Sequence, residues 1–208
     1  MSATRFADAI IYIVDDDSAV REALSSLLRS YGMRVETFSD ARSFLERERS
    51  SSPACLILDV RMPGISGVEL QQRLKPVDPR MPIVFITGHG DIPMAVRAVK
   101  AGAVEFLTKP FSDDALMSAV KQGLRTSIGV KDMPTDVSDL LGRADSLTSR
   151  ERELVELVVV GQKNKQIAAR LHISEITVKV HRRNAMTKMG ARSLAELVRL
   201  IDRLRPST

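Results

Sequence analysis

Five short runs of apolar, largely β-branched residues alternate with amphipathic stretches over the first 125 residues, and this alternation constrains the fold more than any other feature. The runs, each a predicted strand, are Ile10–Val14, Val35–Phe38, Ala54–Leu58, Ile83–Ile86 and Val104–Leu107. The stretches that follow them, each a predicted helix, are Ser18–Tyr31, Asp40–Glu48, Gly67–Lys75, Asp91–Lys100 and Phe111–Arg125. Strands that alternate with helices form a parallel sheet covered on both faces, so the sequence predicts an α/β doubly wound domain with a five-stranded parallel sheet.

The chain changes character after residue 125. Residues 126–146 gather Gly, Pro, Ser and Thr with poor periodicity, which indicates a linker with at most a helical turn near Val137–Leu141. No strand signal follows, and the helical spacing predicts an all-α, four-helix domain. Its helices are expected at Ser149–Val160, Asn164–Leu171, Glu175–Met189 and Ser193–Leu204. The predicted boundaries are therefore 1–125 for the first domain, 126–146 for the linker and 147–208 for the second domain.

Charge is distributed unevenly between the two parts. The net charge of the whole chain is +5, but residues 1–142 carry a net charge of −2 and residues 143–208 a net charge of +7. A basic domain of this kind is typical of a protein that binds a polyanion, although a solvated basic face gives the same count.

Membrane and redox roles are not expected. No apolar run approaches the roughly 18 residues of a membrane span, and the first ten residues lack the pattern of a secretory signal. The single cysteine, Cys55, lies in the apolar run CLIL and is expected to be a small buried hydrophobic residue. The sequence is that expected of a cytoplasmic protein with no membrane partner.

Polar residues follow the predicted strands of the first domain. Asp15 and Asp16 follow the first strand, Asp59 the third and Thr87 the fourth, and Lys109 lies just beyond the fifth. The carboxyl ends of parallel strands meet at one edge, so these side chains are expected to converge. Clustered carboxylates favour Mg²⁺, or Mn²⁺ in its place, and a carboxylate can itself accept a phosphoryl group whose charge an ammonium and a hydroxyl would offset. Taken singly, such an aspartate is more often a helix cap and such a lysine a solvated loop residue, and Asp17 or Ser18 is expected to cap the first helix; it is the four together, in order on successive strand ends, that indicate a site.

Four segments resemble the defining motifs of receiver domains, which have the flavodoxin-like form of the predicted fold. They are VDDD at Val14–Asp17, DVRMPG at Asp59–Gly64, ITGHG at Ile86–Gly90 and FLTKPF at Phe106–Phe111. The resemblance covers about the first 125 residues. It implies that Asp59 is phosphorylated and that the metal is held by Asp15, Asp16, Asp59 and the backbone carbonyl of Arg61.

The same resemblance implies roles for three further residues. Thr87 and Lys109 would contact the phosphoryl group, and the Lys109–Pro110 peptide bond is expected to be cis. Thr87 and Phe106 occupy the positions of a hydroxyl and an aromatic ring that rearrange together when the family is phosphorylated. Phe106 stands where tyrosine is frequent, and a purely structural role in the core is an equal alternative for it.

In the second domain, two predicted helices are joined by the short bend His172–Ser174. Ser174 is a good N-cap for the second of them, and His172 stands where glycine is common, at a position that histidine tolerates. This arrangement predicts a helix-turn-helix whose second helix enters the major groove of DNA. The expected DNA contacts are Lys163, Asn164, Lys165, Thr177, Lys179, Val180, Arg182, Arg183 and Lys188. From charge alone, a solvated basic helix is an equal alternative.

Three segments resemble LuxR-type helix-turn-helix domains: LTSRERELVELV at Leu147–Val158, NKQIAARLHIS at Asn164–Ser174 and TVKVHRRNAMTKM at Thr177–Met189. Together with the receiver motifs, they resemble the NarL/FixJ type of two-component response regulator, with a leaning towards FixJ. The resemblance implies a transcription regulator and not an enzyme, with at most slow self-dephosphorylation. It implies a sensor histidine kinase, promoter DNA, a second copy of the chain after phosphorylation, and RNA polymerase as partners.

Two other functions are compatible with parts of this pattern. A phosphatase that passes through an aspartyl phosphate places its nucleophile after the first strand, whereas the matching carboxylate here follows the third. An RNA-binding second domain would often display stacking aromatic residues, and residues 143–208 contain no Phe, Tyr or Trp.

Overall fold

A computed structural model describes residues 8–88, 92–129 and 137–205 of the chain. The described residues fall into two compact units, the first comprising residues 8–88 and 101–129 and the second comprising residues 92–100 and 137–205. Each unit has its own arrangement of elements and its own hydrophobic core.

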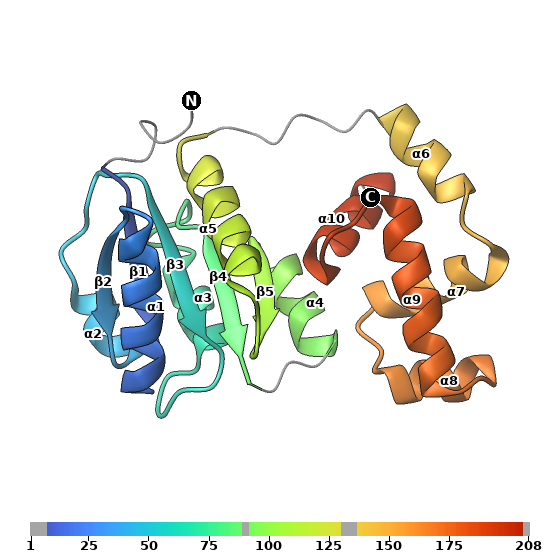
Figure 1. Ribbon diagram of the computed structural model, residues 1–208, viewed down its shortest axis with the longest axis horizontal. Helices are drawn as coiled ribbons and strands as arrows, with labels where there is room; N and C mark the ends of the chain where they lie inside the picture. Colours follow the sequence, from blue (N-terminus) through green and yellow to red (C-terminus); the bar gives the residue numbers. More distant parts are fainter. Residues whose placement is uncertain (1–7, 89–91, 130–136, 206–208) are drawn as a thin grey trace. The chain divides into compact units, whose positions relative to one another are not determined.

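The first unit is built on a five-stranded parallel sheet in the order β2-β1-β3-β4-β5 (Figure 1). The strands are β1 Ile10–Val14, β2 Arg34–Phe38, β3 Ala54–Asp59, β4 Ile83–Thr87 and β5 Glu105–Thr108. The predicted doubly wound fold is confirmed, with β5 shifted by one residue from its expected position. β1, β3 and β4 are buried along their whole length, as expected of central strands covered on both faces.

Four helices cover this sheet, namely α1 Ser18–Ser30, α2 Ala41–Glu46, α3 Gly67–Leu74 and α5 Asp113–Ser127. Leu28 of α1 and Val120 of α5 share a core with Ile13 and Ile57 on one face, and α1 and α5 lie together in front of the sheet in Figure 1. On the other face, Phe44 of α2 packs edge-on against Tyr12. The N-cap of α1 is Asp17, whose side chain accepts from the amides of Ala19 and Val20, and this fixes where the chain turns back from β1.

The second unit is helical in its described residues. Its helices are α4 Ile92–Lys100, α6 Val137–Asp145, α7 Ser149–Val159, α8 Asn164–Leu171, α9 Glu175–Met189 and α10 Leu194–Leu204. A capping box starts α7, where Thr148 accepts from the Glu151 amide and the Glu151 carboxylate accepts from the Thr148 amide. The four helices α7 to α10 confirm the all-α second domain predicted from spacing.

Two features of this unit differ from the sequence predictions. Where a linker with one helical turn was predicted, α6 forms, and its Leu140 is fully buried in the core of the unit. The predicted helix at 91–100 forms as α4 from Ile92, with Asp91 outside the described residues. Its Ile92, Val96 and Val99 belong to the same core as α10. Both differences arise because local periodicity shows that a helix has an apolar face but not which surface covers that face.

None of the helices in the described ranges combines the length and the apolar content that crossing a membrane requires.

Candidate functional site

Lys109 joins two carboxylates at the carboxyl edge of the sheet. Its Nζ donates to Asp15 Oδ2 at 2.8 Å and to Asp59 Oδ1 at 3.0 Å. Both aspartates are buried, whereas the Lys109 side chain keeps 26% of its surface exposed. The three residues come from three different strand ends, so the convergence predicted for Asp15, Asp59 and Lys109 is confirmed.

The surroundings of Asp59 and Lys109 shift the pKa of both side chains upwards. Burial raises the pKa of Asp59, and the hydrogen bonds from Lys109 and from the Arg61 amide, at 2.6 Å, offset only part of that effect. Burial by itself lowers the pKa of Lys109, but its hydrogen bonds to Asp15 and Asp59 outweigh burial and raise it. The ammonium is therefore charged and available to a phosphoryl oxygen.

The residues at this edge suit a hard divalent cation. No three His, Cys, Asp or Glu side chains within the described ranges gather into a ready-made metal cluster. Mg²⁺ needs no such cluster, because it keeps several waters and takes one or two carboxylates. Because the carboxylates of Asp15 and Asp59 contact the same ammonium, they lie close enough together to share one metal ion. Asp16 is exposed beside them, and its role as a ligand stays a prediction.

Thr87 and Phe106, the predicted switch pair, occupy neighbouring strands. Thr87 closes β4 and is almost fully buried, and its carbonyl accepts from the Lys109 amide at 2.7 Å. Phe106 lies on β5, half-buried, with its ring centroid 6.2 Å from that of the buried Phe85. The ring thus has both a packed neighbour and an exposed side. The Lys109–Pro110 peptide bond is cis, as predicted, while His89 and Gly90 of the ITGHG motif lie outside the described residues.

Gly67 is a site residue that the sequence analysis missed. It opens α3, and a Cβ added there would overlap the backbone carbonyl of Asp59. The Gly67 amide also donates to the carbonyl of Val60 at 3.1 Å, which holds the start of α3 against the acceptor loop. The close approach therefore requires glycine, and the signal for it was a glycine at the first position of a predicted helix.

In the second unit, α8 and α9 form the predicted helix-turn-helix. His172 adopts φ 54° and ψ 44°, the left-handed conformation that glycine usually supplies, and Ser174 caps α9 by accepting from the Thr177 amide at 3.1 Å. Val178 and Ile167 are buried between the helices. Both the bend and its cap are as predicted.

The predicted DNA contacts differ in how much of each side chain is exposed to solvent. Lys163, Lys165, Lys179, Val180 and Arg183 are exposed, and Asn164 and Thr177 are half-buried. Arg182 is also half-buried, and burial lowers its pKa. Lys188 donates to the buried Glu151 at 2.7 Å and keeps 35% of its side chain exposed. The exposed residues lie at the start of α8 and along α9, and their contact with DNA stays a prediction.

Ile176 is the second residue that the sequence analysis missed. It lies one turn before Val180 on α9, and these two apolar side chains are 74% and 52% exposed. Residues four apart share one face of a helix, so they form an apolar stripe beside the basic side chains. The sequence signal that could have indicated this stripe was an isoleucine among the polar and basic residues of the predicted helix.

Comparison with known protein families finds two matches, and the first of them includes α4. Residues 11–121 match the response regulator receiver domain, and residues 145–201 match the luxR family of bacterial regulatory proteins.

Several whole proteins are similar over nearly the full chain. The response regulator protein TmoT of Ectopseudomonas mendocina is 49% identical over 96% of this chain and 91% of its own length. The transcriptional regulatory protein FixJ of Bradyrhizobium diazoefficiens is 45% identical over 93% and 94%. Among solved structures, the response regulator StyR is 51% identical with a TM-score of 0.56, covering 95% of this chain and all of that one. Full-length FixJ from B. japonicum is 44% identical with a TM-score of 0.53, covering 94% and 96%.

Proposed function

The chain belongs to the response regulators of the NarL/FixJ type, and on that basis we propose that phosphorylation of Asp59 controls how its LuxR-type domain binds promoter DNA. The observation that carries the proposal is the pair of buried carboxylates, Asp15 and Asp59, held by one lysine ammonium at the carboxyl edge of the sheet. This arrangement would supply, at one place, a carboxylate that accepts the phosphoryl group, a positive charge to offset it, and carboxylates that bind a metal ion. The chain is a transcription regulator and not a classical enzyme.

The acceptor step is a displacement at phosphorus. A carboxylate oxygen of Asp59 bonds to the phosphorus of the donor, the bond from phosphorus to the leaving group breaks, and the leaving group departs with the electron pair. The donor is a phosphohistidine of a sensor kinase or, in the laboratory, acetyl phosphate. Lys109 offsets the negative charge on the phosphoryl oxygens, and the Thr87 hydroxyl donates to one of them. The phosphorylated chain loses the group only slowly by itself.

Asp15, Asp16, Asp59 and the Arg61 carbonyl would hold Mg²⁺ or Mn²⁺. When bound, this ion neutralises the charge that two buried carboxylates and a phosphoryl group would otherwise accumulate.

The signal passes to the second unit through chain continuity. Thr87 closes β4, and the described chain resumes at Ile92 in α4, whose Val96 and Val99 share a core with α10. Phosphorylation adds about 1.5–2 negative charges next to Thr87. Rearrangement of Thr87 and Phe106 then reshapes the surface formed by α4 and β5. That surface either pairs with its copy in a second chain or releases the DNA-binding helices, on a promoter where RNA polymerase acts.

Asp59→Asn tests the acceptor directly. Incubation of the full chain with acetyl phosphate and Mg²⁺ should add one phosphoryl group by intact-mass measurement, and Asp59→Asn should add none. The matched control, Asp114→Asn, removes an exposed carboxylate at the start of α5 and should label like the wild type. Unchanged labelling of Asp59→Asn would place the acceptor elsewhere.

Lys179→Ala combined with Arg183→Ala tests the DNA-binding helix. With duplexes selected by the protein from a random-sequence pool, the double variant should bind more weakly and lose about 0.9 of salt slope for each phosphate contact removed. Arg192→Ala, an exposed arginine outside α9, should leave affinity and slope close to wild type. Equal affinity of the double variant would refute the assignment of α9.

A further inference from the structure

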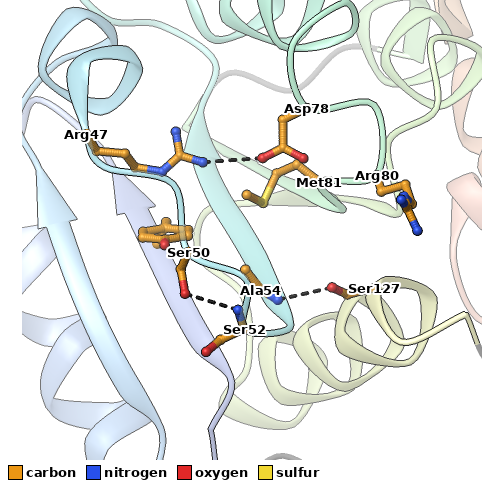
Figure 2. Close-up of a pocket in the computed structure, with 9 residues that line it drawn as sticks. Arg47, Ser50, Ser52, Ala54, Asp78, Arg80, Met81 and Ser127 are labelled. Carbon is orange, nitrogen blue, oxygen red and sulfur yellow. Dashed lines mark hydrogen bonds and ion pairs between the residues drawn. The ribbon is translucent and has the colours of Figure 1, made fainter.

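A second polar cavity lies in the first unit at the amino edge of the sheet, away from Asp59. It is lined by residues of the loops that lead into β3 and β4 and by Ser127 at the end of α5. Figure 2 shows Arg47 directed at Asp78 and the two serines directed at backbone amides of the loop before β3, with Arg80 apart from them. Ala54 opens β3 at this cavity and Asp59 closes the same strand, so about 16 Å of strand separates the two sites. None of the residues assigned to phosphorylation lines this cavity.

Two serine hydroxyls in the cavity have hydrogens left to donate. Ser50 Oγ accepts from the Ser52 amide at 3.1 Å, and Ser127 Oγ accepts from the Ala54 amide at 3.0 Å (Figure 2). Because each oxygen already accepts a backbone N–H, its own O–H can point at a ligand. Both serines are therefore positioned as donors.

Arg47 contributes a buried positive charge that is only partly compensated. Its side chain is 8% exposed, and its guanidinium lies 3.8 Å from the ring centroid of Phe44 and 4.8 Å from that of Tyr12. Its carboxylate partner, Asp78, is 3.4 Å away and 28% exposed, and the buried Nε has no partner among the described residues. A buried cation with one long ion pair leaves positive potential in the cavity.

Arg80 adds a second guanidinium at the rim. It is exposed and forms no ion pair with any residue that the structure describes. The lining thus carries two guanidinium groups against the single carboxylate of Asp78, together with the two serine donors. Because the lining has more hydrogen-bond donors and positive charges than acceptors and negative charges, it favours an anionic ligand with several acceptor oxygens.

The size of the cavity limits that ligand to a small one. Its volume of about 70 Å³ is several times the roughly 10–15 Å³ that one water needs, and its lining is mainly polar. A phosphate or a short carboxylate fits such a space, whereas a nucleotide base or an apolar ligand would have neither room nor partners.

We propose that this cavity binds a small oxyanion through the hydroxyls of Ser50 and Ser127, with the guanidinium groups of Arg47 and Arg80 supplying positive charge. A bound anion would join the loop before β3 to the end of α5, where the first domain leads into the chain that follows. The site does not depend on the chemistry at Asp59.

Amide chemical shifts of the full-length chain test the proposal site by site. Sodium phosphate is titrated at constant ionic strength and without Mg²⁺, and sodium acetate is titrated separately to distinguish a phosphate site from a carboxylate site. Saturable shifts are expected at the amides of Ser52 and Ala54, which donate to the two serine oxygens. The same shifts are expected in Asp59→Asn, which separates this cavity from the acceptor pocket.

Arg80→Ala should lower the affinity for the anion tenfold or more. The protein should still fold, because the Arg80 side chain is exposed. Arg125→Ala, which removes an exposed arginine on α5 outside the cavity, should bind like the wild type. Ser127→Ala should weaken binding as well. Shifts that are absent or non-saturable with both anions, or that are unchanged in Arg80→Ala and Ser127→Ala, would overturn the proposal.

Discussion

Lys188 donates from Nζ to Oε2 of Glu151 at 2.7 Å, which fastens the end of α9 to the capping box that starts α7. The Glu151 side chain is buried, and the Lys188 side chain is only about one third exposed. The residue pair is 37 positions apart in sequence and holds the DNA-binding helix to the body of its unit. A lysine predicted as a DNA contact therefore also has a structural contact.

This pair predicts an acid-sensitive component of stability. The hydrogen bond from Lys188 lowers the pKa of Glu151 below its ordinary 4.5, so its contribution is complete above about pH 4.5 and is lost as the pH falls through the folded pKa. Glu151→Gln should be less stable than wild type at pH 6, and the difference should shrink below pH 4.5. Urea unfolding at several pH values measures it, with the exposed Glu153→Gln as control. A difference that is constant with pH would contradict the assignment.

A pair of neighbouring leucines tests whether α6 belongs to the second unit. Leu140 is fully buried in the core of that unit, and Leu141 is 50% exposed. Leu140→Ala should cost about 2–5 kcal/mol of unfolding free energy, whereas Leu141→Ala should change it by less than about 0.5 kcal/mol. Chemical denaturation of the full chain compares the two. If both substitutions changed the free energy of unfolding equally, α6 would not be part of the core and the segment would be a linker, as first predicted.

Two glycine-to-alanine substitutions test whether Gly67 is needed because α3 starts against the Asp59 carbonyl, or whether any helical glycine would respond in the same way. Gly67→Ala would place a methyl group against the Asp59 carbonyl and should destabilise the first unit by about 1–3 kcal/mol while slowing acetyl-phosphate labelling. Gly142→Ala, in α6 with no atom near the added carbon, should be neutral or stabilise by roughly 0.5–1 kcal/mol. Thermal unfolding and labelling rates measure both. Wild-type behaviour of Gly67→Ala would show that the helix start moves freely.

The apolar stripe of α9 predicts that the protein reads thymine methyl groups. Ile176 and Val180 are exposed beside the basic side chains, and apolar side chains in the major groove contact the methyl group of thymine. Replacing thymine by uracil in a selected duplex should weaken wild-type binding about fourfold for each contacted methyl, which corresponds to about 0.8 kcal/mol. Binding by the Ile176→Ala, Val180→Ala double variant should not respond to that replacement.

The control for this comparison is Val160→Ala, which removes an exposed valine outside α9. It should respond to uracil as the wild type does. A double variant that still discriminates thymine from uracil would move the methyl contact to other residues.

The sequence by itself determined the five strands, most of the helices, and the polar residues that follow the strands. β-branched runs bounded by polar residues gave five strands within one or two residues, because buried central strands need nearly unbroken apolar runs. Asp17 and Ser174 were predictable as caps because capping depends on a few neighbouring residues. The meeting of Asp15, Asp59 and Lys109 followed from strand order alone, since parallel strands end at one edge.

Only the tertiary structure decided which surfaces cover those elements. The helix at Val137–Asp145 is short and owes its order to the burial of Leu140, and α4 buries Val96 and Val99 in a core formed by residues about 100 positions away. The Lys188–Glu151 bond and the oxyanion cavity likewise join segments distant in sequence. Periodicity and capping act over a few residues, whereas burial, ion pairing and cavities depend on contacts between distant segments, which no local pattern specifies.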